Sequence, residues 1–206
     1  MPSDAQTRPV SLRLGLLGGT FDPPHAGHLA AAEAVLGALG LDRVDLLPAH
    51  DPWQKSEGGR EVTPAEVRLE MVRALVGARP GLGVDDREIR RGGVTYTVDT
   101  LLDVRRESPD AEVFLILGAD TARRFHTWHR HEEVASLSTL VIVNRDHEDH
   151  VVPPGAARVE FVHMTPVDVS STAVRADVAA GRDVTELVTP GVARIISAEG
   201  LYGAAR

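Results

Sequence analysis

The sequence contains no cysteine among its 206 residues. Disulfide bonds and metal sites built from thiolates are therefore excluded. No apolar run approaches the roughly 20 consecutive residues that a transmembrane helix requires, and the first residues lack the basic-then-apolar order of a signal peptide. We therefore expect a cytoplasmic protein without a membrane partner.

Positive charge is also in short supply. Lys and Arg number 22 against 30 Asp and Glu, which gives a formal net charge of -8. Proteins that bind nucleic acids generally present a basic surface, so this balance argues against a nucleic-acid partner. A small anionic substrate would have to be met by a few locally placed cations.

Short apolar runs alternate with amphipathic stretches along the chain, which is the pattern of an α/β protein. Strands are expected at residues 12–17, 43–48, 82–89, 112–117, 139–144 and 158–164. Helices are expected at residues 26–39, 63–78, 97–107, 170–180 and 190–198. Thr63-Pro64-Ala65-Glu66 predicts a capping box with proline at the first helical position. The strand at 82–89 should lie near an edge of the sheet, because charged residues interrupt it.

We predict one α/β domain over residues 11–206, with a disordered lead-in at residues 1–10. Its sheet should be doubly wound, Rossmann-like and mostly parallel, with helices on both faces. Such sheets bind ligands beyond the carboxyl ends of their strands, where the strand order reverses. The glycines that follow the first strand and the segment 118–120 that follows the fourth would flank this crevice.

The densest motif runs from Leu14 to His28 and reads LGLLGGTFDPPHAGH. Its apolar run leads to Gly18 and Gly19, which permit a sharp turn and present bare N–H groups. The helix that follows offers open N–H groups and the positive end of its dipole to an anion. His25 and His28, three residues apart, should lie on the same side of this helix. The pattern predicts a phosphate-binding loop.

The string at 18–28 resembles the first signature of the nucleotidyltransferase superfamily, and more narrowly that of the bacterial nicotinate-nucleotide adenylyltransferases. Members of that family join ATP and nicotinate mononucleotide into deamido-NAD (nicotinate adenine dinucleotide) and pyrophosphate. The string DVSSTAVR at 168–175 resembles the second signature of the family, and GAD at 118–120 resembles its ribose-binding segment. The resemblance extends from residue 14 to residue 202, so it implies a nucleotidyltransferase fold and an enzyme of NAD biosynthesis.

The resemblance implies an ATP site and assigns residues to it. His25, His28 and Arg175 would be catalytic, because they would neutralise charge that grows on the phosphate oxygens. The other expected ATP contacts are Gly18, Gly19, Thr20, Phe21, Gly118, Asp120, Ser171 and Thr172. Mg²⁺ would be carried by the ATP phosphates, since no cluster of acidic residues suggests a dedicated protein site for a metal.

The resemblance also implies a site for nicotinate mononucleotide. Its expected residues are Lys55, Tyr96, Thr97, Trp128 and Arg145. Aromatic residues make up only 4% of the chain, and Trp128 stands among several arginines and histidines. We therefore expect it to be partly exposed, with its flat ring available to a flat heterocycle. The pattern departs from the commonest one in the family where Trp53 and Gln54 precede Lys55, and where His50 stands in place of a frequent asparagine.

Other functions compete with this one. An adenylyltransferase for nicotinamide mononucleotide or phosphopantetheine would keep the same ATP site. A non-catalytic nucleotide-binding module would keep the fold, although loss of a signature histidine would then be expected and both are present. A zinc site at His129, His131, His147 and His150 is disfavoured, because neither pair has the helical H-E-x-x-H spacing. The oligomeric state stays open, a homo-oligomer included.

Overall fold

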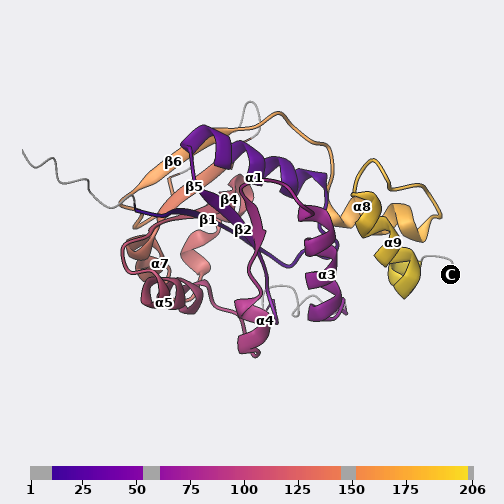
Figure 1. Cartoon of the computed structure of the whole chain (residues 1–206), viewed down its shortest axis with the longest axis horizontal. Helices are drawn as coiled ribbons and strands as arrows, with labels where there is room; N and C mark the ends of the chain where they lie inside the picture. The colour runs from indigo at the N-terminus through magenta and orange to yellow at the C-terminus, as the bar shows by residue number, and fades with distance from the viewer. Residues whose placement is uncertain (1–10, 53–60, 145–151, 204–206) are drawn as a thin grey trace, which may run out of the picture.

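The computed structural model describes residues 11–52, 61–144 and 152–203, so the expected lead-in at 1–10 lies outside the described residues. In the described part, six parallel strands form one sheet in the order β3-β2-β1-β4-β5-β6 (Figure 1). The strands are β1 (Arg13–Gly19), β2 (Arg43–Pro48), β3 (Leu82–Val84), β4 (Glu112–Gly118), β5 (Thr139–Asn144) and β6 (Val159–His163). The order reverses between β1 and β4, which confirms the predicted doubly wound fold.

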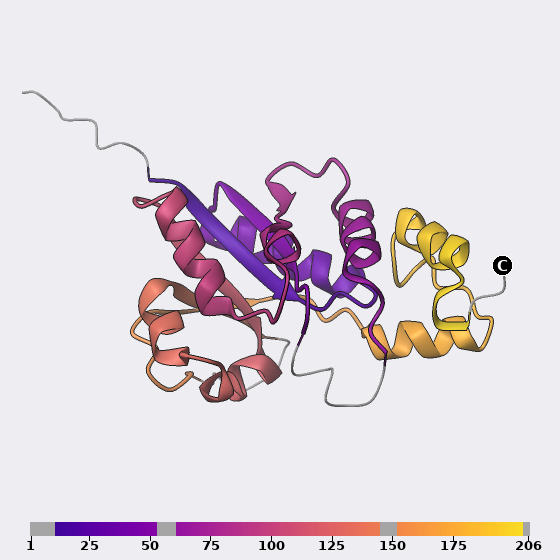
Figure 2. The same ribbon diagram turned by 90° about the horizontal axis from the view of Figure 1, so that it is seen from below.

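Helices cover both faces of this sheet, with α1 and α3 on one face and α5 and α7 on the other (Figures 1 and 2). Helix α9 lies beside α3, and α8 is joined to it through contacts with η2. The helices are α1 (Ala26–Leu39), α3 (Ala65–Val76), α4 (Arg87–Arg91), α5 (Thr97–Glu107), α6 (Ala119–Arg123), α7 (His131–Leu137), α8 (Ser171–Ala179) and α9 (Pro190–Glu199), and η1 (Phe125–Thr127) and η2 (Leu201–Gly203) are short 3₁₀ turns. In the described residues, no helix has the length and apolar composition needed to cross a bilayer.

Strand β4 shows how the apolar runs build two cores. Phe114 and Ile116 point to the side that α1 and α3 cover, whereas Leu115 and Leu117 point to the side of α5 and α7. A parallel strand that is buried on both faces must be apolar at successive positions, which explains its unbroken hydrophobic run. Each of these side chains contributes about 1.5–3 kcal/mol through burial.

The expected strand at 82–89 is wrong beyond Val84. Asp85 accepts a hydrogen bond from the backbone N–H of Arg87 at 2.9 Å, and the chain then turns into the short helix α4. A side chain that bonds the backbone two residues ahead favours a turn over a sheet ladder. The expected edge position of this strand is confirmed.

The expected capping box at 63–66 is also wrong. Helix α3 begins at Ala65, Pro64 occupies the N-cap, and no side chain caps the helix. The hydroxyl of Thr63 instead donates to the Tyr202 hydroxyl at 3.3 Å. A contact with the far end of the chain has replaced the local one. The bounds of the other expected elements are confirmed to within two residues, and the helices α4, α6 and α7 were not expected.

The sharp turn expected at Gly18 and Gly19 falls two residues later. Both glycines complete β1, and the left-handed backbone conformation belongs to Phe21, with φ of 52°. Glycine is required at position 19 by the lack of space rather than by the backbone conformation. A Cβ there would lie 3.0–3.2 Å from the ring of Phe21. A Cβ on Gly18 would meet nothing within 4 Å.

Candidate active site

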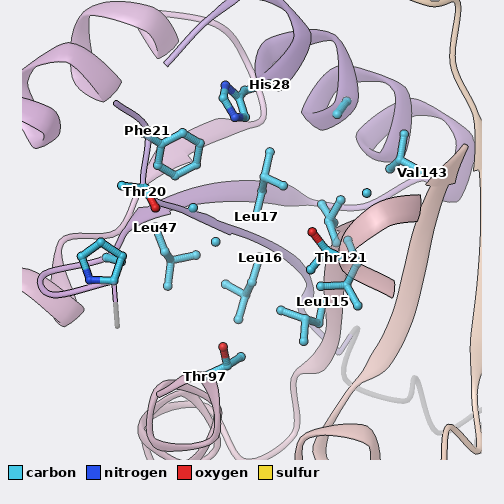
Figure 3. Close-up of a pocket in the computed structure, with 18 of the residues that line it drawn as sticks. Leu16, Leu17, Thr20, Phe21, His28, Leu47, Thr97, Leu115, Thr121 and Val143 are labelled. Carbon is cyan, nitrogen blue, oxygen red and sulfur yellow. The ribbon is translucent and has the colours of Figure 1, made fainter. Parts of the chain in front are cut away.

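A cavity of about 530 Å³ lies at the carboxyl ends of β1 and β4, where the strand order reverses. Leu16 and Leu17 of β1 and Leu115 of β4 form part of its wall (Figure 3). Figure 3 shows His28 on α1 and Thr97 at the start of α5 entering the cavity from opposite sides of the sheet. This volume is typical of small-molecule sites, and the position is the one predicted for a doubly wound sheet.

Most of the expected site residues meet in this cavity. Its lining includes Gly18, Gly19, Thr20, Phe21, His25, His28, Tyr96, Thr97, Gly118, Asp120, Trp128 and Ser171. Thr172 and Arg175 are not part of the described lining. Lys55 and Arg145 lie outside the described residues, as do Trp53 and Gln54. Segments that are remote in the sequence thus converge on one cavity.

His25 and His28 lie together at the N-terminus of α1. Their ring centroids are 3.8 Å apart and their planes are tilted by 31°. The backbone N–H of His25 donates to Nδ1 of His28 at 3.2 Å, so a neutral His28 carries its proton on Nε2. The ring of Phe21 packs edge-on against His28, with centroids 4.9 Å apart. The open N–H groups expected at the start of α1 are largely occupied, because the N–H of Ala26 donates to the carbonyl oxygen of Leu187 at 2.9 Å and that of His28 to the carbonyl oxygen of His25 at 3.0 Å. The histidine pair and the positive end of the helix dipole still suit this end of the cavity to a phosphate group.

The second signature contacts the loop that carries His25. Nη1 of Arg175 donates to the carbonyl oxygen of Asp22 at 2.7 Å, and the Ser171 hydroxyl donates to that of Pro23 at 2.9 Å. Nη2 of Arg175 also donates to the hydroxyl of Thr172 at 3.1 Å. These bonds hold the loop, whereas direct contacts of the three residues with ATP stay predictions.

Asp120 and Gly118 border the cavity at the start of α6. The Asp120 side chain is 88% exposed and pairs with Arg123 at 2.8 Å. An exposed carboxylate at the rim of the cavity is available to accept hydrogen bonds from sugar hydroxyls. Its expected ribose contact stays a prediction.

Trp128 is half-buried, so its predicted partial exposure is confirmed. Its ring packs against Phe125, with centroids 5.5 Å apart. The ring of Tyr96 lies 4.5 Å from that of His129, and both line the same cavity. The cavity therefore has an aromatic wall next to the N-terminus of α5, although stacking of Trp128 on a ligand stays a prediction.

Arg68 supports the site and was missed in the sequence. Its side chain is 1% exposed, and burial lowers the pKa of its guanidinium. The guanidinium donates to four backbone carbonyl groups at 2.6–2.9 Å, those of Thr20, Ala49, His50 and Thr63. These charge-assisted bonds offset the cost of burying the cation. The sequence offered one indication of this burial: Arg68 stands four residues before Val72, which places it on the apolar face of α3.

Glu88 is the second residue that was missed. It lines the cavity and is only 6% exposed. The Thr100 hydroxyl donates to Oε1 of Glu88 at 2.6 Å. Burial raises the pKa of Glu88 to about 7, with the bond from Thr100 acting in the opposite direction. The sequence predicted a strand over residues 82–89 that charged residues interrupt, and nothing in that pattern marked Glu88 as a buried carboxyl.

Comparisons with known proteins identify the family. The model of the cytidylyltransferase-like family matches residues 16–177. A Corynebacterium kroppenstedtii protein named "Probable nicotinate-nucleotide adenylyltransferase" is 44% identical, over 92% of this chain and 90% of that protein. A Dehalococcoides mccartyi protein of the same name is 39% identical, over 94% of this chain and 98% of that protein. The chain belongs to the nicotinate-nucleotide adenylyltransferase family.

Solved structures share the fold of this nicotinate-nucleotide adenylyltransferase family member. The nicotinic acid mononucleotide adenylyltransferase of Plasmodium falciparum complexed with NaAD superposes with a TM-score of 0.78 at 16% identity. The alignment covers 94% of this chain and 98% of that one. The same Plasmodium protein complexed with APC gives a TM-score of 0.76 at 15% identity, with the same coverage. These likenesses confirm the Rossmann-like nucleotidyltransferase fold.

Proposed function

We propose that this cavity binds ATP and nicotinate mononucleotide side by side and transfers the adenylyl group from the first to the second. The chain is a nicotinate-nucleotide adenylyltransferase of NAD biosynthesis, and its products are nicotinate adenine dinucleotide and pyrophosphate. The observation that carries the assignment of the site is the convergence of the histidine pair, the 118–120 segment and the aromatic wall at one switch point.

The ATP phosphates are assigned to the end of the cavity next to the N-terminus of α1. There the positive end of the helix dipole, His25 and His28 would face them, with Arg175 one loop away. An oxygen of the acceptor 5′-phosphate attacks the α-phosphorus in line, and the bond to the bridging oxygen breaks as pyrophosphate leaves with the electron pair. Both reactants are anions, so positioning and charge neutralisation supply the catalysis.

Mg²⁺ is proposed to enter on the ATP phosphates. Among the described residues, no group of three or more His, Asp or Glu side chains is placed to hold a metal ion. An ion that enters with ATP would be held by phosphate oxygens and water, as Mg²⁺ commonly is, and needs no protein cage. When bound, the ion neutralises phosphate charge.

The acceptor base is assigned to the other side of the sheet, at the start of α5. Tyr96 is the N-cap of this helix and Thr97 its first residue, so the N–H groups of the first two helical residues would face a ring carboxylate. Trp128 would stack on the pyridine ring. Lys55 and Arg145 would add positive charge near the acceptor phosphate.

Partners and location follow from the same proposal. We assign the reaction to the cytoplasm, which the absence of cysteine supports. The acidic net charge supports small nucleotides rather than a nucleic acid as partners. Light scattering during size-exclusion chromatography measures the mass of the particle and so tests whether the chain forms a homo-oligomer.

The decisive assay is pyrophosphate release from Mg-ATP with a single acceptor present. Nicotinate mononucleotide, nicotinamide mononucleotide and phosphopantetheine are offered separately, and the dinucleotide product is identified by its mass. We expect the highest kcat/KM with nicotinate mononucleotide. Preference for phosphopantetheine would reassign the acceptor, and ATP binding without turnover on any acceptor would indicate the non-catalytic module.

A further inference from the structure

The loop between β1 and α1, residues 20–25, is held by η2, the last turn in the described part of the chain. The hydroxyl of Tyr202, in η2, donates to Oδ1 of Asp22 at 2.5 Å, across 180 residues of sequence. The same hydroxyl accepts a hydrogen bond from Thr63 at 3.3 Å. Asp22 is 1% exposed, so its carboxylate depends on protein partners for solvation.

The C-terminal turn is shaped to present this hydroxyl. Tyr202 has φ of 57°, in the left-handed region, and the neighbouring Gly200 and Gly203 also have positive φ. A left-handed conformation in a residue with a side chain is uncommon and persists where surrounding contacts hold it. Burial and the bond to Asp22 raise the pKa of Tyr202. Its hydroxyl therefore remains a donor throughout the neutral range.

The rest of the loop is also bound by C-terminal residues. Arg175 donates to the carbonyl oxygen of Asp22 and Ser171 to that of Pro23. The backbone N–H of Ala26 donates to the carbonyl oxygen of Leu187 at 2.9 Å. The backbone on both sides of His25 is thus attached to the α8–η2 part of the chain, and Tyr202 adds a bond to the buried carboxylate of Asp22.

We propose that Tyr202 is a positioning residue for the histidine pair. Its bond to Asp22 fixes the backbone between Phe21 and His25, and so the direction in which the two imidazoles face the phosphate being transferred. This inference rests on the proposed function for its kinetic consequence, since an imidazole displaced by a fraction of an ångström loses charge stabilisation in the transition state. The loop geometry itself is independent of that function.

The first test is Tyr202→Phe, which removes only the hydroxyl. We expect kcat to fall about tenfold, because the loop keeps its other bonds but loses its alignment. The KM for nicotinate mononucleotide should stay within about twofold, because the acceptor wall at α5 is untouched. Both constants are measured at saturating Mg-ATP, together with the Tm.

Thr189→Val is the matched control. The Thr189 hydroxyl donates to the carbonyl oxygen of Ala74 at 3.3 Å. Like Tyr202, it joins the C-terminal part of the chain to an earlier element, here α3, but it does not contact the loop at residues 20–25. It should lower the Tm and leave kcat unchanged. An equal fall of kcat in both variants would reduce Tyr202 to a stabilising contact and overturn the proposal.

Variants of Asp22 test the bond from its other side. Asp22→Asn keeps an acceptor oxygen and should retain more activity than Asp22→Ala. In the Asp22→Ala background, Tyr202→Phe should produce no further loss, because the two changes remove the same hydrogen bond. Additive losses in kcat would contradict a shared role.

A readout without turnover separates this inference from the proposed function. In protein labelled at histidine, the side-chain NMR signals of His25 and His28 are assigned with single His→Ala variants. Tyr202→Phe should shift or broaden these two signals, and Thr189→Val should leave them in place. Movement of the signals in a protein that shows no adenylyl transfer would preserve the positioning role and reject the function. Unmoved signals and an unchanged kcat in folded Tyr202→Phe would reject the positioning role.

Discussion

At the scale of single residues, the site combines a histidine pair with two buried ionisable side chains. His25 and His28 stand 3.8 Å apart at a helix N-terminus, Arg68 remains buried as a cation bound by four carbonyl oxygens, and Glu88 is a carboxyl beneath the cavity. Each of these side chains depends on neighbours from other elements, so each is open to a test by substitution.

His28→Ala should lower turnover by about 10²- to 10³-fold, or ~2.7 to 4 kcal/mol of barrier, the size of one lost transition-state donor. The fold should survive, because the side chain borders the cavity rather than the core. His126→Ala, an exposed histidine of η1, is the control and should behave as wild type. A folded His28→Ala enzyme of normal turnover would remove His28 from the mechanism.

Glu88 should make stability depend on pH. The pKa of its carboxyl is raised from 4.5 to about 7 in the folded state, so between these values the folded state binds more protons than the unfolded one. Stability therefore falls as the pH rises from about 4.5 to about 7 and levels off above, a change of up to about 3 kcal/mol.

Glu88→Gln should abolish this component of the pH dependence, because an amide does not titrate and can still accept from Thr100. The free energy of unfolding in urea is measured for both proteins at pH 5 and pH 8. The variant should gain stability relative to wild type at pH 8. Parallel pH profiles would show that Glu88 is ionised in the folded protein across the whole range.

At the scale of elements, the carboxyl end of β1 shapes the side of the cavity that we assign to ATP. Its two glycines differ in their surroundings: a Cβ on Gly19 would press on the ring of Phe21, and one on Gly18 would enter open space. Phe21 in turn packs on His28. Crowding at Gly19 is therefore transmitted to a proposed catalytic side chain.

Gly19→Ala should lower the free energy of unfolding by about 1–3 kcal/mol through overpacking and should also lower kcat. Gly18→Ala should change stability by less than about 0.5 kcal/mol. It should instead raise the KM for ATP, since the added methyl group enters the cavity. Chemical denaturation and steady-state kinetics of the two variants check the pair, and equal stability losses would contradict the contact geometry.

At the scale of the whole molecule, two cores on opposite faces of one sheet bring distant segments together at the switch point. The first face supplies His28 through α1, and the second supplies Thr97 through α5 (Figure 3). The proposed reaction needs both substrates in one cavity, so acceptor choice should depend on the side formed by α5, Tyr96 and Trp128.

The acceptor side should prefer the acid to the amide. A ring carboxylate accepts hydrogen bonds only, which matches the N–H groups at the start of α5 and the Thr97 hydroxyl. The amide would place an NH₂ group against donors, at about 1–3 kcal/mol for each buried group left unpaired, or roughly tenfold or more in specificity. The ratio of kcat/KM for nicotinate and nicotinamide mononucleotide measures this preference. A ratio near one would contradict the preference for the acid but would remain compatible with adenylyl transfer.

The sequence by itself determined the local features of this protein. The bounds of α1, β2, α5 and β5 follow from apolar periodicity and from caps such as Gly40, whose φ of 57° ends α1. The alternation of strands and helices predicted the doubly wound sheet, and the motifs predicted which segments meet at its switch point. These features depend on neighbouring residues or on general rules of chain connection, so they can be read without coordinates.

Tertiary structure alone decided the rest. The bond of Thr63 to Tyr202 in place of a capping box, the attachment of Tyr202 to Asp22, and the carbonyl groups around Arg68 join residues far apart in the sequence. The same is true of Glu88, because its pKa depends on burial beneath the cavity. A sequence pattern records the residue types that can make such contacts, but only packing determines which polar groups lose water and must find each other.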